Sequence, residues 1–439
     1  MKSKKISKLF YLSFILIFWI LIFTLTCKNP SGPGIDFNLR NWYIMSGMAA
    51  GPGFTNNITY GDSNIIDPSP ANSNKLFTDD GKTYYRIPEL LALPNGDLLA
   101  FADKRAVGAG DLPNQIEVYV RKSTNNGTNW GPEKRITPVS TSKKDGHGDT
   151  AAVLDRKTGD IIAVVAFGQG FLNSTPQDPI RIRTIRSRDN GESWEAPIDI
   201  TSQIYGAGCG DFTRRNWHAA FVTAGNGLQM RNGRIMFVLN VRESSQLMVQ
   251  NYVMYSDDGG HKWKVSSGSP KNTRRGGEAK VVELNDGSLL MHIRWTPNRL
   301  QSRSYDNGET WTEATAINGI LSSDSNGDLI VYTSTKNGYD KDRLITLVDS
   351  TVWNGQRNGY PGKPKFYISY DEGYTWTNSK ELYGEDAGYS SLAILKDGSI
   401  GILAELGNSW NGPIYFLKTS IEWCNSNDNP CSPNVSAKK

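Results

Sequence analysis

Short apolar runs alternate with polar residues along most of this chain, and many of these runs form pairs that flank a turn-forming dipeptide. An apolar run on each side of an Asn-Gly, Asp-Gly or Thr-Gly corner predicts a β-hairpin, because these residues accept the positive φ angles of a tight turn. Five such hairpins are predicted, at residues 90–105, 151–167, 227–241, 279–295 and 391–406. Long helical periodicity is absent from the sequence, so the pattern predicts a nearly all-β protein.

A repeated eight-residue pattern, Ser-x-Asp-x-Gly-x-x-Trp, marks a second class of turn, and we call each copy a box. The copies occupy residues 123–130, 187–194, 256–263, 304–311 and 369–376, and in the first of them Asn125 replaces the Asp. A short Asp side chain can bond its own backbone two residues on, and Gly supplies the positive φ of a corner. The Trp offers a large surface for burial, so each box predicts a turn that ends in the core.

The spacing of the boxes indicates the architecture. Successive boxes begin 64, 69, 48 and 65 residues apart, which is close to the length of one or two four-stranded blades. A supersecondary unit repeated at such intervals is typical of a solenoid or a propeller. About six blades fit the 439 residues. The five boxes leave this count open, because the first and last segments can share one blade.

Composition agrees with one large catalytic or binding domain at residues 75–439. The 12 Trp, 19 Tyr and 15 Phe residues can fill a sizeable core and also line a carbohydrate-binding cleft. The net charge is only +4, and positive and negative residues are interspersed. This distribution lacks the basic surface that nucleic acid requires, so we expect no nucleic-acid partner.

The N-terminus has the pattern of an export signal, which we assign to residues 1–27. Four lysines within the first eight residues precede an uncharged apolar run at 9–26. The run ends at Cys27, so two alternatives stay open: a lipid-modified cysteine that attaches the protein to a membrane, or an ordinary signal peptide or uncleaved anchor. Either way we expect an exported protein, on the cell surface, in the periplasm or outer membrane, or secreted, with a leader segment at 28–74.

Three further cysteines follow the export signal. Cys424 and Cys431 are seven residues apart in a polar tail and could pair outside the cytoplasm, which would leave Cys209 over. No Cys/His spacing in the sequence indicates a zinc site. We expect neither a metal nor an organic cofactor.

The tetrapeptide Tyr85-Arg86-Ile87-Pro88, followed by the boxes, resembles the sialidase (neuraminidase) family. Members of that family carry a Phe/Tyr-Arg-Ile-Pro motif ahead of the repeats, and the resemblance covers roughly residues 75–423. It implies an all-β, six-bladed β-propeller of the sialidase type. Boxes alone are weakly specific, because sorting receptors, some glucanases and assembly factors also carry them, but the combination with the tetrapeptide is strong.

The resemblance implies three arginines that bind the carboxylate of a sialic acid. Arginine suits this task because its planar fork can bind a carboxylate through two hydrogen bonds. Arg86 fits the first by its motif, and Arg294, in Met-His-Ile-Arg-Trp, fits the second by its position after the third box. For the third, Arg357 and Arg343 both precede the last box, and we choose Arg357 because it lies nearer the strand that leads into that box.

The resemblance also implies a tyrosine nucleophile, since a carboxylate would be repelled by the substrate's own carboxylate. Tyr389 follows the last box and precedes a hairpin, as the family's tyrosine does. A phenol with an ordinary pKa near 10 needs a neighbouring base and cationic surroundings. Glu278 fits that base, in a Gly-Glu-x-x-Val-Val-Glu stretch where Gly277 replaces the family's Asn. Glu283 and Glu243 are rivals.

Three remaining side chains complete the expected site. Asp111 lies in a Gly-rich loop 25 residues after Arg86 and is our choice for the acid/base, with Asp103 as its competitor. Arg105 is expected to shape the side of the pocket that takes the N-acetyl group. Glu405 lies 16 residues after Tyr389, where the family places a carboxylate that holds the first arginine, so we expect it to pair with Arg86.

Together these residues imply a retaining exo-sialidase, a glycoside hydrolase that acts through a covalent sialyl-tyrosine. Its expected partners are sialylated glycoproteins, glycolipids or oligosaccharides, and we expect a monomer. Two alternatives stay open: a trans-sialidase or intramolecular trans-sialidase that passes the same intermediate to another acceptor, and a propeller that binds glycans without chemistry. All of the site residues come from segments spread over more than 300 positions. The fold must therefore bring them to one end of the propeller axis.

Overall fold

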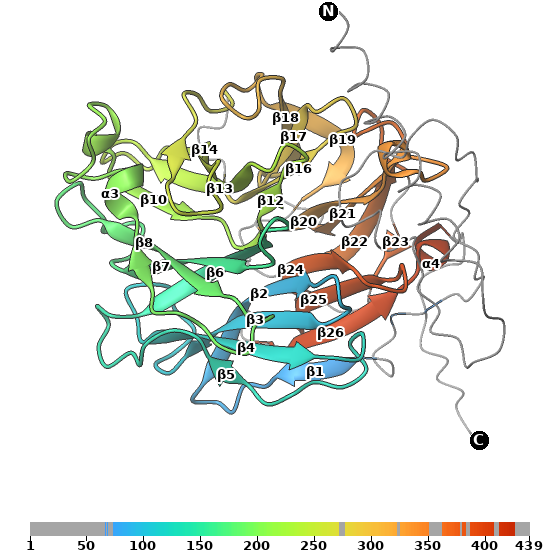
Figure 1. Cartoon of the computed structure of the whole chain (residues 1–439), viewed down its shortest axis with the longest axis horizontal. Helices are drawn as coiled ribbons and strands as arrows, with labels where there is room; N and C mark the ends of the chain where they lie inside the picture. The colour runs from blue at the N-terminus through green and yellow to red at the C-terminus, as the bar shows by residue number, and fades with distance from the viewer. Residues whose placement is uncertain are drawn as a thin grey trace, which may run out of the picture. The chain divides into compact units, whose positions relative to one another are not determined.

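The computed structural model describes residues 66, 68, 73–271, 277–322, 325–350, 362–377, 380–382, 387–407 and 412–425. Within these ranges the chain forms six small, mainly antiparallel sheets arranged as a six-bladed β-propeller, which confirms the predicted fold class. Figure 1 shows the sheets following one another around a common centre in chain order. Helical structure in the same ranges is limited to α3 (Thr201–Ile204), α4 (Ile421–Asn425) and two 3-10 turns, Arg214–Asn216 and Thr335–Asn337.

The first three blades follow one another without interruption. Blade 1 contains β2 (Tyr84–Ala92), β3 (Leu98–Arg105), β4 (Ile116–Ser123) and β5 (Lys134–Arg135). Blade 2 contains β6 (His147–Leu154), β7 (Ile161–Gly168), β8 (Ile180–Ser187) and β9 (Ile198–Asp199), and β11 (Gly225–Asn226) adds to β6 in parallel. Blade 3 contains β10 (Ala219–Val222), β12 (Leu228–Gln229), β13 (Ile235–Arg242), β14 (Val249–Ser256) and β15 (Lys264–Val265).

Blades 4 and 5 continue the ring, and blade 6 closes it with strands from both ends of the described chain. Blade 4 contains β16 (Ala279–Glu283), β17 (Leu289–Ile293), β18 (Asn298–Ser304) and β19 (Thr315–Leu321). Blade 5 contains β20 (Asp328–Thr333), β21 (Arg343–Ser350), β22 (Lys363–Ser369) and β23 (Lys380–Glu381). Blade 6 contains β24 (Ala387–Ile394), β25 (Ile400–Leu406), β26 (Ile414–Thr419) and β1 (Asn74–Phe77). The first and last segments therefore share one blade, as the spacing of the boxes allowed.

All five predicted hairpins are present, as β2–β3, β6–β7, β12–β13, β16–β17 and β24–β25. The five boxes form the turns that join β4 to β5, β8 to β9, β14 to β15, β18 to β19 and β22 to β23, at the outer edges of blades 1 to 5. Each box Gly has a positive φ, as predicted, for example +83° at Gly191. The hydrogen bonding differs from the prediction: Asp189 accepts from the backbone N–H four residues on, at Ser193 (2.8 Å). The hydroxyl of Ser187 accepts from the N–H of Gly191 (2.9 Å) and donates to Asp189.

The box tryptophans join neighbouring blades. The ring of Trp130, in blade 1, packs edge-on against Phe416 of blade 6 at a centroid distance of 5.1 Å. Trp194, in blade 2, packs against Phe101 of blade 1 at 5.7 Å. Because aromatic rings bury large areas, each box stabilises the contact between its blade and the preceding one. The core of the protein is thus a ring of apolar clusters between adjacent sheets.

The ends of the chain bear on several predictions from the sequence. Residues 1–27, with the export signal and Cys27, and most of 28–74 lie outside the described residues, so the export signal and the leader stay predictions. Cys424 is buried in α4, and Cys431 lies outside the described residues, so their pairing also stays a prediction. In the described part of the chain, no helix combines the length and the hydropathy that a membrane crossing needs.

Candidate functional site

The first strand of each blade lines the propeller axis, and three of these strands are interrupted near their first residues. The pairing register shifts between Arg86 and Glu89 in β2, between Gly148 and Ala151 in β6, and between Ala387 and Ser390 in β24. Such bulges bend a strand and redirect a side chain, and they are common next to functional sites. These three strands meet, because β2 contacts both β6 and β24. The bulges therefore present side chains at one end of the axis.

The backbone at the first of these bulges is strained. Ile87, in the Tyr-Arg-Ile-Pro tetrapeptide, has a φ of +61°, which is unfavourable for a β-branched residue. The N–H of Ile87 donates to Oε1 of Glu405 (2.8 Å), which helps to hold this conformation. Local strain of this kind persists only where the surrounding contacts fix it, and it is concentrated at functional sites.

Tyr389 lies at the centre of a three-residue cluster. Its phenolic oxygen donates to Oε2 of Glu278 across 2.7 Å and accepts from Nη1 of Arg294 across 2.8 Å. Arg294 also forms an ion pair with Glu278. The two partners face each other across the β16–β17 hairpin, where the N–H of Arg294 donates to the Glu278 carbonyl (2.9 Å). A residue of blade 6 thus contacts a carboxylate and a guanidinium from blade 4.

Gly277, which departs from the family's Asn, lies directly beneath this cluster. A Cβ atom at Gly277 would lie 2.9 Å from Cδ of Arg294, closer than real Cβ contacts. The absence of a side chain therefore lets the Arg294 stem pack against the backbone on its way to Tyr389.

Glu405 binds Arg86 and the two backbone segments beside it. The guanidinium of Arg86 donates from Nε to Oε1 (3.1 Å) and from Nη2 to Oε2 (3.2 Å), which is a two-point fork. The same carboxylate accepts from the N–H of Ile87 and from the N–H of Tyr389 (3.0 Å). The guanidinium carbon of Arg86 lies 5.2 Å from the centroid of the Tyr389 ring. Glu405 therefore fixes the first arginine and the tyrosine relative to each other.

The electrostatics of the cluster keep the phenol neutral and the arginine charged. Burial raises the pKa of Tyr389 well above 10, and the lowering effect of Arg294 is opposed by Glu278. Burial alone would lower the pKa of Arg86, but Glu405, with Tyr389 and Asp111, raises it above its ordinary value. A neutral phenol bonded to a carboxylate is the arrangement in which a base removes the proton only as the oxygen attacks.

The loop after β3 carries a second acidic group. Asp111 has a side chain that is 74% exposed, and its Oδ1 accepts from Nη1 of Arg105 across 2.8 Å. Arg105 is fully buried and also donates to Oδ2 of Asp103 (3.2 Å). Burial raises the pKa of Asp103 to about 6, and Arg105 opposes the shift. Of the two rivals for the acid/base, Asp111 can therefore reach a bound molecule, whereas Asp103 supports Arg105 from below.

Asp149 belongs to the same region, and the sequence argument did not include it. It has a φ of +55°, and its N–H donates to both carboxylate oxygens of Asp103. Its side chain is half-buried, and burial together with Asp103 and Asp111 raises its pKa well above the ordinary value. The only signal for it in the sequence is a Gly-Asp pair just before a predicted hairpin, which is too common to be informative.

The other predicted residues are placed differently. Arg357 lies outside the described residues, so its role stays a prediction; the nearest described residue, Gly362, pairs with Ala387, two positions before Tyr389. Arg343 bonds Asp340 and Thr333, and Thr333 is the last residue of β20. The first residue of β20, Asp328, is the one that lies beside the strand of Tyr389, where it accepts from the N–H of Leu392. Arg343 is therefore at the wrong end of the strand, and the structure removes it as a rival. Glu283 is held by Arg231 near the hairpin corner after β16. Glu243 accepts from the Tyr252 hydroxyl, and neither glutamate contacts Tyr389 through a hydrogen bond within the described residues.

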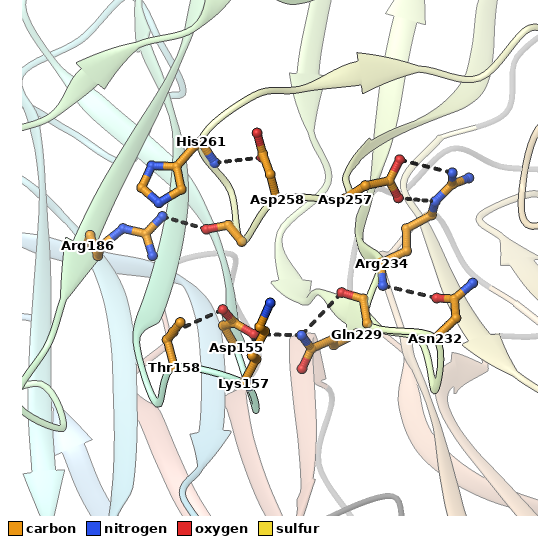
Figure 2. Close-up of a pocket in the computed structure, with 12 residues that line it drawn as sticks. Asp155, Lys157, Thr158, Arg186, Gln229, Asn232, Arg234, Asp257, Asp258 and His261 are labelled. Carbon is orange, nitrogen blue, oxygen red and sulfur yellow. Dashed lines mark hydrogen bonds and ion pairs between the residues drawn. The ribbon is translucent and has the colours of Figure 1, made fainter. Parts of the chain in front are cut away.

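A pocket of about 570 Å³ lies between blades 2 and 3, away from this cluster. Figure 2 shows its lining, in which Asp155 bonds Gln229 (2.7 Å) and Asp257 bonds Arg234 (2.8 Å). Asp155 follows the last residue of β6, whereas Asp149 lies near the first, so the pocket is at the opposite end of the strands. None of the side chains chosen for chemistry lines it. We therefore place the candidate active site at Tyr389 and not at this pocket.

In the described ranges no group of three or more His, Cys, Asp or Glu side chains is placed to hold a metal ion. The cluster at Tyr389 can instead bind an anion through arginine, remove a proton through Glu278 and supply a nucleophilic oxygen.

Comparisons with known proteins place this geometry in a family. The model of the BNR repeat-like domain matches residues 87–365. A sialidase of Bacteroides fragilis is 30% identical over 352 residues, which are 74% of this chain and 61% of that protein. A sialidase of Micromonospora viridifaciens is 27% identical over 388 residues, which are 81% of this chain and 56% of that protein. This chain thus spans less than two thirds of either relative.

A solved structure agrees with the sequence relatives. The Hadza microbial sialidase Hz136 has a TM-score of 0.68 and 26% identity, and the match covers 80% of this chain and 68% of that one. The family match extends over more than half of the described propeller, from the tetrapeptide to the strand before the last box. The chain therefore belongs to the BNR repeat-like family, and the relatives that it matches are sialidases.

Proposed function

We propose that this protein is an exo-α-sialidase, a glycoside hydrolase that releases terminal sialic acid from glycoconjugates with retention of configuration. The single observation that carries the proposal is the 2.7 Å hydrogen bond from the Tyr389 phenol to Glu278, beside Arg86 and Arg294. A neutral phenol held between a base and two arginines suits an anionic substrate. A carboxylate nucleophile in its place would repel the substrate's carboxylate.

In the first half-reaction, the arginine forks of Arg86 and Arg294 bind the substrate carboxylate, with Arg357 as the predicted third. The Tyr389 oxygen attacks the anomeric carbon while its proton passes to Glu278. The bond to the leaving oxygen breaks, and Asp111 gives that oxygen a proton. The products are the free aglycone alcohol and a covalent sialyl-tyrosine.

In the second half-reaction, Asp111, now ionised, takes a proton from a water molecule that attacks the same carbon. The bond to the tyrosine oxygen breaks, and Glu278 returns the proton to the phenol. Two inversions at one carbon give overall retention. The exposed position of Asp111 and its bond to the buried Arg105 suit a group that meets both the aglycone and water.

The experiment that tests this function is the incubation of the full chain with a fluorogenic α-sialoside, with product analysis by mass spectrometry and early-time NMR. The proposal expects free sialic acid whose first-formed anomer is α. A β anomer would contradict the retaining mechanism, and a 2,7-anhydro or transferred product would favour the trans-sialidase alternative. No release at all would leave a glycan-binding propeller. Export to the cell surface, with or without a lipid on Cys27, remains part of the proposal.

A further inference from the structure

Side chains from the first residue of β20 and from the segment just before it hold the backbone on both sides of Tyr389. The hydroxyl of Ser325 donates to the carbonyl of Gly388 (2.9 Å), and the N–H of Ser390 donates to Oδ1 of Asn326 (3.2 Å). Two residues further on, the N–H of Leu392 donates to Oδ2 of Asp328 (2.6 Å). The side chains at 325, 326 and 328 thus follow β24 residue by residue.

These contacts take the place of a strand ladder. The register shift between Ala387 and Ser390 takes the backbone around Tyr389 out of its regular pairing with β25. Buried backbone groups need partners, and β20 and β24 belong to different sheets that exchange no ladder bonds. Glu405 supplies the partner for the N–H of Tyr389, and Ser325 and Asn326 supply those for the residues before and after it.

The segment that carries Ser325 and Asn326 is itself fixed by a buried cation. Arg299 is 1% exposed and donates from Nη1 to the Ser325 carbonyl (3.3 Å) and from Nη2 to the Asn326 carbonyl. Gly327 has a φ of +62°, and a Cβ there would lie 2.8 Å from Nη1 of Arg299. A guanidinium packed against a glycine leaves the segment little freedom to move.

Among the described residues, the side-chain amide of Asn326 forms a hydrogen bond through its oxygen and none through its nitrogen. Its Oδ1 accepts from Ser390, and its Nδ2 is buried without a hydrogen-bond partner in the part of the chain that the structure describes. An aspartate at this position would keep the acceptor, and the buried charge of Arg299 lies close to it. Alanine would remove the acceptor and leave the N–H of Ser390 unpaired.

We propose that Asn326 and Ser325 are positioning residues that place the Tyr389 oxygen for attack, without touching the substrate themselves. This inference rests on the proposed function. A displacement of about 1 Å at a reacting group can lower a rate by about 100-fold. The substrate arginines do not depend on these bonds, so their loss acts on kcat rather than on KM.

The test compares Asn326→Ala, Asn326→Asp and Ser325→Ala with the parent, and uses Ser302→Ala as a matched control. Ser302 is buried in β18, and its hydroxyl donates to the Thr312 carbonyl (2.7 Å). Ser302→Ala therefore removes a hydroxyl-to-carbonyl bond of the same kind as Ser325→Ala does, at a place remote from Tyr389. For each protein, kcat and KM on a fluorogenic sialoside and the thermal midpoint are measured. We expect Asn326→Ala to lower kcat by about 10- to 100-fold with KM changed by less than about threefold.

Asn326→Asp should restore kcat to within about fivefold of the parent, because the acceptor is kept. Ser325→Ala should lower kcat, whereas Ser302→Ala should lower only the thermal midpoint. If the parent is active and Asn326→Ala keeps its kcat, or if Ser302→Ala loses as much kcat as Ser325→Ala, the positioning role is overturned while the proposed function stands. An inactive parent would overturn both.

Discussion

The phenol of Tyr389, in blade 6, donates a hydrogen bond of 2.7 Å to the carboxylate of Glu278, in blade 4. The two residues are 111 positions apart in the sequence, and strand β20 of blade 5 lies between their strands and contacts both. Only the closed ring of the propeller brings them together. The pair therefore depends on the whole fold, and the losses in kcat/KM from variants of the two partners should not add in the double variant.

Glu278→Gln removes the proton acceptor and keeps the shape of the side chain. We expect kcat/KM to fall by about 10² to 10⁴, the usual contribution of a positioned general base. Glu283→Gln is the control, because Glu283 binds Arg231 near the far end of the same strand and should leave kcat/KM within about twofold. Equal losses in the two variants would show that Glu278 has no special role.

Glu405→Ala should destabilise the fold as well as the site. The carboxylate is 3% exposed, and its removal leaves the guanidinium of Arg86 buried without this partner. Removing one partner of a buried pair costs about 3–5 kcal/mol, so denaturant unfolding should show a loss of that order. Glu195→Ala breaks the exposed Arg188–Glu195 pair, which solvent screens, and should leave the free energy of unfolding nearly unchanged. A cost for Glu405→Ala no greater than that of Glu195→Ala would contradict the structure.

The stability of the protein should carry a signature of Asp103 at acidic pH. Its pKa rises from 3.8 in the unfolded chain to about 6 in the fold, so the folded state binds the proton more tightly. This contribution is fully present below pH 3.8 and is lost as the pH rises through 6. Its size is about 1–3 kcal/mol, shared with the neighbouring Asp149.

The measurement is the free energy of unfolding of the parent minus that of Asp103→Asn, at several pH values. This difference should fall between pH 4 and pH 6, because carboxylates that do not interact with Asp103 titrate alike in both proteins and cancel. A difference that rises with pH would mean that Asp103 is a stabilised carboxylate instead.

The box glycines should differ from other turn glycines in their tolerance of alanine. Gly127 has a φ of +85°, and a Cβ there would lie 2.3 Å from the Phe416 ring of blade 6. Gly233 has a φ of +93° with nothing within 4 Å. Gly233→Ala should cost about 1–2 kcal/mol from backbone strain, and Gly127→Ala about 1–3 kcal/mol more from the clash. Equal costs in thermal or chemical unfolding would argue against packing of the box on the neighbouring blade.

Much of the fold follows from local sequence signals. Two-residue Gly corners predicted five of the six inner hairpins, and the boxes predicted the outer turns. The β20–β21 hairpin of blade 5 was not predicted, because a longer loop at residues 334–342, which contains a 3-10 turn, joins its two strands. No short corner marks that connection, and periodicity alone does not distinguish such strands from loop.

The candidate site also contains residues that the sequence predicts and residues that it does not. Arg86, Glu278, Arg294, Tyr389 and Glu405 occur at recognisable offsets from the tetrapeptide and the boxes, and the structure brings these five together. Asp149 and Asn326 have no such offsets. Their positions depend on a bulge and on contacts between blades, which arise only when the ring closes.

The defining step of the proposed reaction is a covalent bond between Tyr389 and the sugar, and this bond can be trapped chemically. In a 2,3-difluoro sialic acid the fluorine on the anomeric carbon leaves as fluoride when the Tyr389 oxygen attacks, and the fluorine on C3 slows the second step. The reagent should therefore add one 3-fluorosialyl group per chain. Fragment ions of the tryptic peptide 381–396 must place the group on Tyr389 rather than Tyr383. We expect this label in the parent and its loss in Tyr389→Phe; a label on any other residue, or a Tyr389→Phe variant that still turns over the substrate, would show that Tyr389 is not the nucleophile.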